Sequence, residues 1–593
     1  MCGIVGVVVP HWKLERRRLF CTTAMEALKA RGPDGKGYLD GACWSFGHRR
    51  LSIIDVPGGQ QPMSDGSGRY TIVFNGEITN YQIVRTHLRQ AGHYFNTASD
   101  TEVVLRAFME WGERCVYELE GMYAFAIIDE WSESLFIARD PLGIKPLYYK
   151  FIEDGIVFAS EIRALYASGE VKFEPAWENI NEFLIFGSVA GEQTLHKDIY
   201  ELPGGHWARW QRDKWDMQRF WYPIREENTE LGDTDAACTE LAVEVERAIQ
   251  NWTVSDVGLG VFLSGGLDSG VVAAVAANHI QGLRSFTISM PNYDVADERQ
   301  VATLVAKRIG SEHTNVVVGL EYQNTANALT ELANLQDHPL HDSNSLTLYM
   351  LCYAVRQKSD LRVILTGDGA DELFAGYGRH AEIAESYRLS RNPEIINLAN
   401  NWMTIERMKL FAESDKIANT TRLDLAHALR GDTALRKVLE FDQLCFLPPY
   451  LRRMDCISMG FGMEMRPALL DHKLVEYANA IASDQLVRKA DEGNITKYPL
   501  RQVASQLLPS NVAWNRKKVQ FSLPSSQMFD RGGPLHTLAR ETFSDGCFLE
   551  HIYDPIGIRE LLQSHSSQSE SSDHSNTLFR LLALELWLDS MWS

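Results

Sequence analysis

The strongest constraint on the fold is an alternation of apolar and helical segments in the second half of the chain. Strand-like runs at residues 257–263, 283–289 and 361–367 are separated by helix-like stretches such as 270–280 and 299–309. This alternation is typical of a doubly wound parallel α/β sheet covered by helices. Because such sheets bind ligands at the carboxyl ends of their strands, each loop that follows a strand is a candidate site. After about residue 380 the sequence predicts mainly helices.

The first half has a different pattern. A segment rich in Gly, Trp and charge, at about 203–232, predicts a domain junction. With roughly 100 to 200 residues per domain, we expect an α/β multidomain chain: a first domain at 2–205, a junction at 206–232 and a second domain at 233–593. Short β-branched and aromatic runs predict layered strands with covering helices in the first domain, at residues 3–9, 70–78, 122–130, 135–140, 147–151 and 155–160.

Composition and charge exclude several classes of protein. The 593 residues are 45% hydrophobic and 23% charged, as in soluble globular proteins. The net charge of −20 argues against a general nucleic-acid or anionic-membrane binder, and no apolar run is long enough to predict a membrane span. Nine cysteines without paired spacing favour a reduced, cytoplasmic protein. Residues 1–10 are apolar but lack a preceding basic segment, so we expect no signal peptide.

Cys2 combines a nucleophile and a base on one residue. Removal of Met1 would leave its thiol beside a free α-amine, whose pKa of about 7.7 to 8.0 suits a general base near neutrality. The alternative is a small buried hydrophobic residue. The motifs that follow favour the nucleophile: RGPD (31–34), GHRRLSIID (47–55), FNGE (74–77), SDTE (99–102) and ARDPLGIKPLYY (138–149).

With these motifs, residues 2–205 resemble the class II glutamine amidotransferases. The resemblance implies an αββα sandwich of the N-terminal nucleophile hydrolase type, in which Cys2 forms a γ-glutamyl thioester and ammonia is released. It implies that Arg50 binds the α-carboxylate of glutamine, and that Glu77 and Asp100 hold the ammonium end. Asn75 and the backbone amide of Gly76 would stabilise the oxyanion.

Two loops of the second half have the composition of a nucleotide site. SGGLDS (264–269) lies between a predicted strand and a helix, where small residues and a helix N-terminus suit phosphate. It lacks the Walker ending and resembles the pyrophosphatase loop of enzymes that cleave ATP to AMP and pyrophosphate. TGDGADE (366–372) clusters carboxylates that suit Mg²⁺. An ordinary turn is the alternative for each loop.

Together with KYPLRQ (497–502) and residues 451–472, these loops make the whole chain resemble the glutamine-hydrolysing asparagine synthetases. The resemblance assigns Asp268 and Asp371 to Mg²⁺. It assigns Lys497 to charge stabilisation while an acyl-adenylate forms and breaks down, with Asp368 beside it at the acceptor. The residues that it places around ATP are Leu263, Ser264, Gly265, Gly266, Asp268, Ser269, Ile288, Gly367 and Lys518.

The sequence departs from this family pattern near the acceptor. Cys456 replaces a usually basic residue, RPALLDH (466–472) replaces RVPFLDH, and residues 337–343 are rich in histidine. These histidines are either acceptor contacts or hydrogen-bonded loop residues.

Aspartate is the favoured acceptor, and another carboxylic acid of secondary metabolism is the alternative. Closure of a β-lactam is disfavoured, because β-lactam synthetases lack the cysteine nucleophile. A non-catalytic sensor or storage protein is the alternative from another class. The expected partners are small molecules, without nucleic acid or membrane, and a homodimer is one option for assembly.

Overall fold

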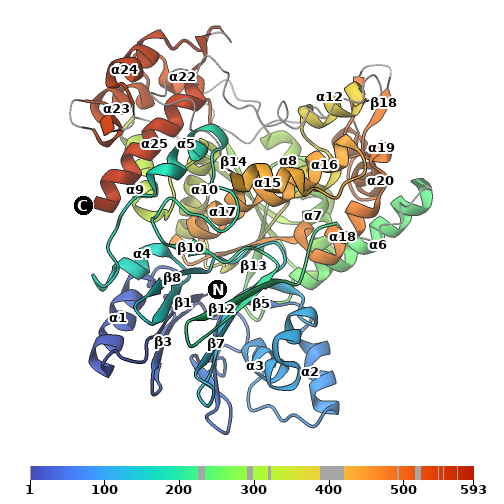
Figure 1. The fold of residues 1–593 in the computed structure, drawn as a ribbon. Coiled ribbons are helices and arrows are strands. Elements are labelled where there is room, and N and C mark those ends of the chain that lie inside the picture. Colours follow the sequence, from blue (N-terminus) through green and yellow to red (C-terminus); the bar gives the residue numbers. More distant parts are fainter. Residues whose placement is uncertain are drawn as a thin grey trace.

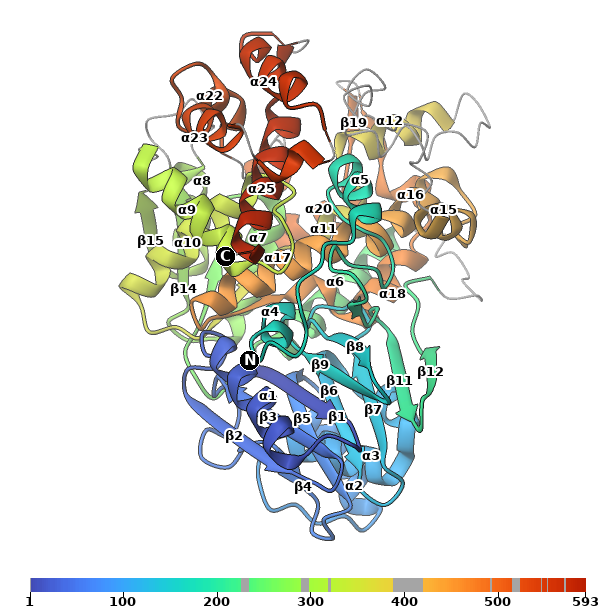
Figure 2. The ribbon, with the colours of Figure 1, turned by 60° about the vertical axis from the view of Figure 1, so that its left-hand side comes forward.

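The computed structural model shows two halves in contact. It describes residues 2–224, 234–289, 298–317, 322–387, 420–490, 493–514, 523–544, 547–551, 553–569 and 572–592. The N-terminal half lies below the C-terminal half in Figure 1, and the N-terminus lies where they meet. The same boundary is visible after rotation in Figure 2. The predicted α/β multidomain fold is confirmed.

Two six-stranded sheets stack face to face in the N-terminal half. Their core contains Ile4, Phe46, Val73 and Phe158, which point inward from alternate strand positions. The first sheet has the order β10-β8-β9-β1-β3-β2 and the second β12-β11-β7-β6-β5-β4. The bounds are β1 Cys2–Val8, β2 Gly35–Asp40, β3 Trp44–Arg50, β4 Met63–Ser64, β5 Tyr70–Ile78, β6 Gly121–Asp129, β7 Ser134–Arg139, β8 Tyr148–Ile152, β9 Gly155–Ala159, β10 Tyr200–Glu201, β11 His206–Gln211 and β12 Lys214–Arg219.

Helices cover the outer faces of both sheets, which completes the predicted αββα layers. Helix α1 (Leu14–Ala27) packs Phe20 and Ala24 onto the first sheet. Helices α2 (Tyr81–Gln90) and α3 (Asp100–Trp111) cover the second. Strand β11 pairs with β7, so the second sheet extends past residue 205 into the predicted junction. Trp and Arg alternate there with small and polar residues, and this composition predicts a domain junction where the structure has two strands.

A five-stranded parallel sheet forms the centre of the C-terminal half, in the order β15-β14-β13-β16-β17. The sequence predicted β13 (Leu259–Phe262), β14 (Arg284–Ser289) and β16 (Val363–Thr366). It missed β15 (Glu312–Val317) because this edge strand is polar and partly exposed. It also missed β17 (Glu464–Pro467), because the sequence after about residue 380 predicts mainly helices. The four residues of β17 are Glu, Met, Arg and Pro, yet all are buried.

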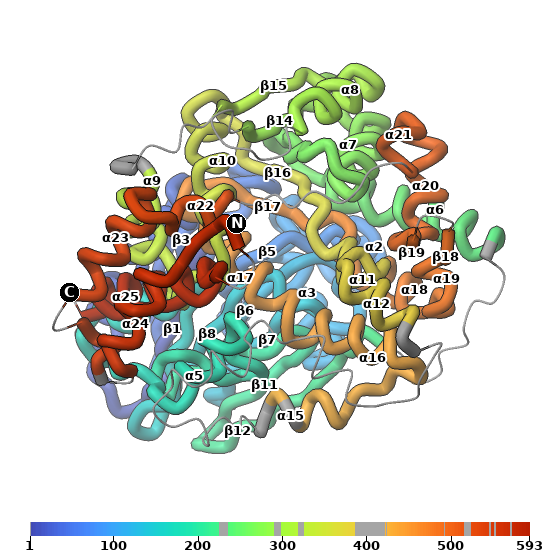
Figure 3. The backbone as a smooth tube through the Cα atoms, turned by 90° about the horizontal axis from the view of Figure 1, so that it is seen from above, coloured from blue at the N-terminus to red at the C-terminus, as the bar shows by residue number. Residues whose placement is uncertain are grey.

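Helices surround the parallel sheet, and the C-terminal helices α22–α25 lie on the opposite side of the molecule from α16, α18 and α20 (Figure 3). The remaining helices that bear on the site are α6 (Thr234–Trp252), α7 (Leu267–His279), α8 (Arg299–Ile309), α9 (Tyr322–Leu335), α10 (Asn344–Lys358), α11 (Ala370–Phe374), α12 (Gly378–Tyr387), α16 (Ala434–Phe441), α17 (Leu447–Gly460), α18 (His472–Ala480), α20 (Tyr498–Leu507), α22 (Ser525–Phe529), α23 (Pro534–Thr542), α24 (Pro555–Ser564) and α25 (Ser575–Trp592).

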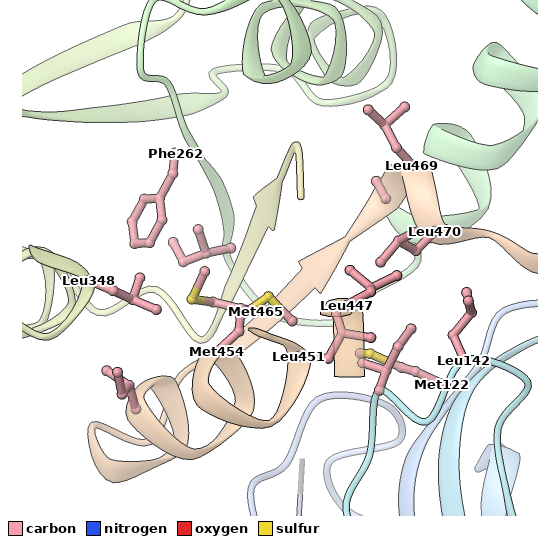
Figure 4. Close-up of a cluster of buried hydrophobic side chains, with 14 of the residues drawn as sticks. Met122, Leu142, Phe262, Leu348, Leu447, Leu451, Met454, Met465, Leu469 and Leu470 are labelled. Atoms are coloured by element: carbon pink, nitrogen blue, oxygen red, sulfur yellow. The ribbon is translucent and has the colours of Figure 1, made fainter. Parts of the chain in front are cut away.

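Apolar side chains from both halves meet at the boundary. Met122 and Leu142 of the N-terminal half face Leu451 and Met454 of α17 and Met465 of β17 (Figure 4). These residues belong to one continuous buried cluster. The halves therefore share a hydrophobic core, whose burial favours one fixed arrangement.

A buried charge cluster crosses the same boundary. Asp455 of α17 has a fully buried side chain, 0% exposed, and accepts hydrogen bonds from Arg31 Nη2 at 2.8 Å and Lys145 Nζ at 3.0 Å. Burial opposes ionisation of Asp455, but Arg31 and Lys145 outweigh it and lower its pKa. The two cations from the N-terminal half thus hold one carboxylate of the C-terminal half.

We predict that Asp455→Asn destabilises the protein by about 3 to 5 kcal/mol, because it leaves Arg31 and Lys145 buried without their shared anion. Urea unfolding followed by tryptophan fluorescence would measure the loss. The matched control is Asp360→Asn, which removes an ion pair between Arg284 and a carboxylate that is 97% exposed and should cost no more than about 1 kcal/mol. Equal unfolding midpoints for the two variants would contradict the prediction.

Candidate functional site

Cys2 begins the central part of the first sheet and lies beside two of the predicted glutamine-binding residues. Strand pairing sets Cys2 opposite Arg50 of β3. The backbone nitrogen of Cys2 donates to Asn75 Oδ1 at 2.9 Å, and its carbonyl oxygen accepts from Arg31 Nε at 3.1 Å. Burial raises the pKa of the Cys2 thiol, and the amino terminus and Arg50 only partly offset this effect.

Asn75 and Gly76 lie next to each other on β5. Asn75 is fully buried, and its Nδ2 has no hydrogen-bond partner among the described residues. A buried amide donor without a partner is costly unless a ligand satisfies it. A Cβ on Gly76 would lie 2.3 Å from the carbonyl oxygen of Met122, so the sheet excludes any side chain at this position. The site therefore presents an unused donor beside the Cys2 backbone.

Arg50 holds the loop that follows β3. Its guanidinium donates to the carbonyl oxygens of Val56 at 2.8 Å, Asp55 at 2.7 Å and Ile54 at 3.2 Å. These bonds use three of the five N–H donors of an arginine. These three hydrogen bonds fix the orientation of the Arg50 guanidinium and leave its other N–H donors for a ligand.

Two carboxyl groups lie on the same side of the site as Asn75. Asp100, at the start of α3, accepts from the backbone nitrogen of Ile78 at 3.2 Å. Burial raises the pKa of Asp100 to about 6, against the hydrogen bonds that favour its charged form. Burial also raises the pKa of Glu77 well above its usual value, and the nearby carboxylate of Glu464 adds to the shift. The structure thus brings together Cys2, Arg50, Asn75, Gly76, Glu77 and Asp100.

The two predicted nucleotide loops touch each other at the carboxyl edge of the parallel sheet. Ser264 Oγ and Ser269 Oγ are 3.0 Å apart across the first loop, where Gly265 has a φ of +76°. A Cβ on Gly367 would lie 2.7 Å from the backbone nitrogen of Ser269, so the second loop passes directly against the first. Gly266 is the N-cap residue of α7, Leu263 directly follows β13 and Ile288 lies on the neighbouring β14.

Lys497 joins these loops. Its Nζ lies 2.6 Å from Asp268 Oδ2 and 2.7 Å from Asp371 Oδ1. Burial opposes its charge, but the two carboxylates outweigh burial and raise its pKa. Lys497 directly precedes α20 with a φ of +54°, so it lies just outside the helix that carries Arg501. This left-handed conformation is uncommon for residues other than glycine and is strained for lysine.

The donor set fits Mg²⁺ together with phosphate. Asp268 and Asp371 face one point from two loops, and Mg²⁺ in phosphate-transfer sites commonly uses one or two carboxylates with phosphate oxygens and water. Within the described ranges there is no group of three or more His, Cys, Asp or Glu side chains placed to hold a metal. Asp368 lies exposed between Gly367 and Gly369, and Lys518 lies outside the described residues.

Comparison with known proteins matches both halves to known families. Residues 1–221 match the family described as glutamine amidotransferase domain, and residues 240–589 match asparagine synthase. Asparagine synthetase [glutamine-hydrolyzing] 3 of Bacillus subtilis is 31% identical over 542 residues, which cover 87% of this chain and 86% of that protein. The chain belongs to the glutamine-hydrolysing asparagine synthetase family. Like its relatives, it is a ligase with a glutamine amidotransferase domain.

A second relative agrees with this assignment. Asparagine synthetase [glutamine-hydrolyzing] 1 of Bacillus subtilis is 29% identical over 633 residues, which cover 99% of this chain and 96% of that protein. A solved structure of the allosteric regulatory enzyme of purine biosynthesis matches 54% of this chain and 80% of its own, at 16% identity and a TM-score of 0.29. Every helix in the described part of this synthetase-family chain is too short or too polar to cross a bilayer.

The histidine-rich loop of this family member is tied into the boundary between the halves. Asp337 accepts from the backbone nitrogens of Ile162 and Arg163 at 2.9 and 3.0 Å. Asp342 accepts from Arg453 Nη1 at 2.8 Å. The loop and Cys456 line an interdomain cavity of about 50 Å³. Its carboxylates therefore have structural partners, and its histidines lie near the cavity.

The sequence motifs assign no role to four further buried residues near the site: Arg31, Asp455, Glu464 and Arg466. Each lies within a motif that the resemblance used, but its partner is distant in the sequence. Arg466, for example, lies 3.5 Å from Glu77, across 389 positions of the chain. Spacing within a motif carries no signal for such a contact.

We predict that Lys497→Met destabilises the synthetase half, because Asp268 and Asp371 would then lose the positive charge that lies between them. The expected loss is about 2 to 3 kcal/mol, below the value for a fully buried pair, because the two carboxylates are 24% and 18% exposed. Thermal unfolding would show the loss, and Mg²⁺ should restore part of it by replacing the missing charge. The control is Lys473→Met, whose lysine pairs with Glu120 but is 50% exposed. A variant as stable as the wild type, with or without Mg²⁺, would contradict the prediction.

Proposed function

We propose that this amidotransferase releases ammonia from glutamine at Cys2 and uses it to convert aspartate, activated as an acyl-AMP, into asparagine. The observation that carries the glutaminase step is the position of Asn75. Its Oδ1 accepts from the nitrogen of Cys2, while its Nδ2 is buried without a partner among the described residues. The same amide thus fixes the nucleophile's nitrogen and offers a donor to an oxyanion beside the thiol.

The proposed first reaction begins after removal of Met1, which makes the nitrogen of Cys2 an α-amine. The amine takes the thiol proton, Sγ attacks the γ-amide carbon of glutamine, and the oxyanion accepts from Asn75 Nδ2 and the Gly76 N–H. The amide nitrogen leaves as ammonia with the proton from the α-amine. Water then hydrolyses the thioester, which yields glutamate and restores the thiol.

Charged residues would orient glutamine in this pocket. We propose that the remaining N–H donors of Arg50 bind its α-carboxylate and that Glu77 and Asp100 bind its α-ammonium. Both carboxyl groups are buried, so a bound ammonium would favour their ionised forms. These two contacts would explain why the pocket beside Cys2 has both a basic group, Arg50, and two acidic groups, Glu77 and Asp100.

The second reaction would take place at the carboxyl edge of the parallel sheet. We propose that the loop from Leu263 to Ser269 holds the phosphates of ATP through backbone N–H groups, while Ile288 and Gly367 border the AMP portion. Mg²⁺, when bound, neutralises phosphate charge and would be held by Asp268 and Asp371. Lys497 then lies where negative charge develops as pyrophosphate leaves, with Asp368 on the acceptor side. Attack of ammonia on the acyl-AMP gives the amide, AMP and a proton.

Ammonia must pass between the two sites unprotonated. The apolar cluster of Figure 4 extends from Met122, whose carbonyl oxygen packs against Gly76, to Leu470, whose side chain packs against Gly369. We infer that ammonia crosses here, because in bulk water at pH 7 it would be mostly protonated and unable to attack the acyl-AMP. Only apolar groups that exclude water would preserve the free amine.

The relatives named asparagine synthetase support aspartate as the acceptor. The alternative is amidation of a different carboxylic acid by the same two reactions. It is favoured by Cys456, which stands where the family usually has a basic residue, and by the histidines of the 337–343 loop, which line the interdomain cavity together with Cys456. A non-catalytic role is disfavoured by the unused donor of Asn75 and the strained, paired Lys497.

We predict that Cys2→Ala abolishes glutamine-dependent amide formation but leaves synthesis from added ammonium salt, because only the first site uses the thiol. Product and AMP would be measured with each nitrogen source, and mass spectrometry of the N-terminal peptide would show whether Met1 is removed. Cys21→Ala is the control, since this buried cysteine lies on α1. Equal loss of both activities in Cys2→Ala would contradict separate sites.

We predict that ATP–pyrophosphate exchange requires aspartate when a panel of carboxylic acids is tested without ammonia. Exchange reports acyl-AMP formation alone, so it identifies the acceptor independently of glutaminase activity. Exchange with another acid and none with aspartate would support the alternative acceptor. Mass spectrometry of the product formed with glutamine would then identify the amide.

A further inference from the structure

We propose that Arg466, on strand β17 of the synthetase half, is a positioning residue of the glutaminase site and holds Glu77 for the ammonium end of glutamine. This inference rests on the proposed glutaminase function. Arg466 Nη2 lies 3.5 Å from Glu77 Oε1, and the arginine side chain is 1% exposed. A residue of the second half thus supplies a buried cation to the pocket of the first.

The head of Arg466 is fixed independently of Glu77. Its Nη1 donates to the carbonyl oxygens of Trp252 at 2.9 Å and Val254 at 2.6 Å, and its Nε donates to the carboxylate of Glu464. Strand β17 is itself paired with β16, with Leu365 opposite Arg466. Backbone carbonyls and the sheet register therefore determine where the guanidinium of Arg466 lies, and the guanidinium in turn orients the carboxylate of Glu77.

The remaining nitrogen of the guanidinium faces the glutamine pocket. Nη2 makes no hydrogen bond within the described residues, and 3.5 Å to Glu77 is slightly longer than a charge-assisted hydrogen bond. Contacts of this kind in a ligand-free site often tighten when substrate binds. The unused donor is thus placed to draw the Glu77 carboxylate into one orientation.

The charge balance of the pocket gives Arg466 a second effect. Three buried carboxyl groups, Glu77, Asp100 and Glu464, lie near this one guanidinium. Burial raises the pKa of Glu77, Glu464 and Asp100 raise it further, and Arg466 and the amino terminus lower it. For Glu464, burial is outweighed by Arg466, the amino terminus and Lys145, so its pKa is lowered. Arg466 thus favours the ionised carboxylates that an ammonium group needs.

The direction in which pH changes glutamine binding follows from these electrostatic interactions of Glu77. Ionised Glu77 binds the ammonium, so glutamine binding is present above the apparent pKa of the pocket and is lost as pH falls through it. Removal of the Arg466 charge raises that pKa further. The acidic limb of kcat/KM for glutamine should therefore move to higher pH. The coupled carboxyl groups titrate together, so the limb reports the pocket as a whole.

The test compares Arg466→Gln with Arg466→Lys in the full-length enzyme, by glutaminase assays between about pH 5 and 9. We expect Arg466→Gln to raise KM for glutamine about tenfold or more, with a smaller change in kcat, and to move the acidic limb up by about one pH unit. Arg466→Lys keeps the charge and should restore the limb. If Arg466 only supported the fold, Arg466→Lys would not restore the acidic limb that Arg466→Gln displaces.

Two further variants keep the test decisive. Glu464→Gln removes a like charge near Glu77 and should move the limb to lower pH, which tests the proposal even if Arg466→Gln does not fold. Arg436→Gln is the matched control, because Arg436 is also buried in the synthetase half but donates to Asn479 Oδ1 and to the carbonyl oxygen of Ile481. Its KM and pH profile should equal those of the wild type.

The outcomes separate this inference from the proposed function. The role of the Arg466 charge would be overturned if Arg466→Gln kept the wild-type KM for glutamine and the wild-type acidic limb. It would also be overturned if Arg466→Gln and Arg466→Lys shifted the limb equally. A limb that moves to higher pH in Glu464→Gln would overturn it as well. If the wild-type enzyme shows no glutaminase activity at any pH, the proposed function itself fails, and the inference with it.

Discussion

The carboxylate of Asp455 has no contact with solvent and is stable there only because Arg31 and Lys145 reach it from the other half of the molecule. Arg31 also pairs with Glu161 of its own half, but Lys145 and Asp455 pair across the boundary, so the halves depend on each other electrostatically. Arg31 also donates to the carbonyl oxygen of Cys2. The ion cluster that joins the halves therefore also holds the backbone of the proposed nucleophile.

The two proposed sites lie on opposite edges of the short parallel sheet. Strand β17 begins at Glu464, near Glu77, and after Pro467 the chain continues to Leu470, against Gly369 in the second nucleotide loop. Four residues of strand and one turn thus separate the proposed glutamine pocket from the proposed adenylation loop. An enzyme that makes ammonia in one place and consumes it in another benefits from such a short separation.

Buried charge appears in both sites but has a different arrangement in each. Lys497 lies between two carboxylates, so its charge is compensated and its pKa is raised. Arg466 faces Glu77, Glu464 and Asp100, so the acidic groups are in excess and two of them have raised pKa values. The first arrangement suits a site that binds phosphate with Mg²⁺, and the second suits a site that accepts an ammonium group.

The amino-acid sequence by itself determined the local elements and the chemistry-bearing motifs. Apolar runs predicted β1, β5, β6, β13, β14 and β16, and SGGLDS and TGDGADE marked loops that the structure brings together. These signals are local, because strand periodicity and small residues act over a few positions. Edge strand β15 and buried polar strand β17 gave no such signal, and β11 and β12 had the composition of a linker.

Only the tertiary structure decided how distant residues meet. Arg466 against Glu77, Asp455 between Arg31 and Lys145, and the left-handed Lys497 between Asp268 and Asp371 join positions far apart in the chain. Such contacts depend on the packing of one half against the other, and burial then makes each charge require a partner. Any buried charge needs a partner of opposite charge, but the fold determines which residue is that partner.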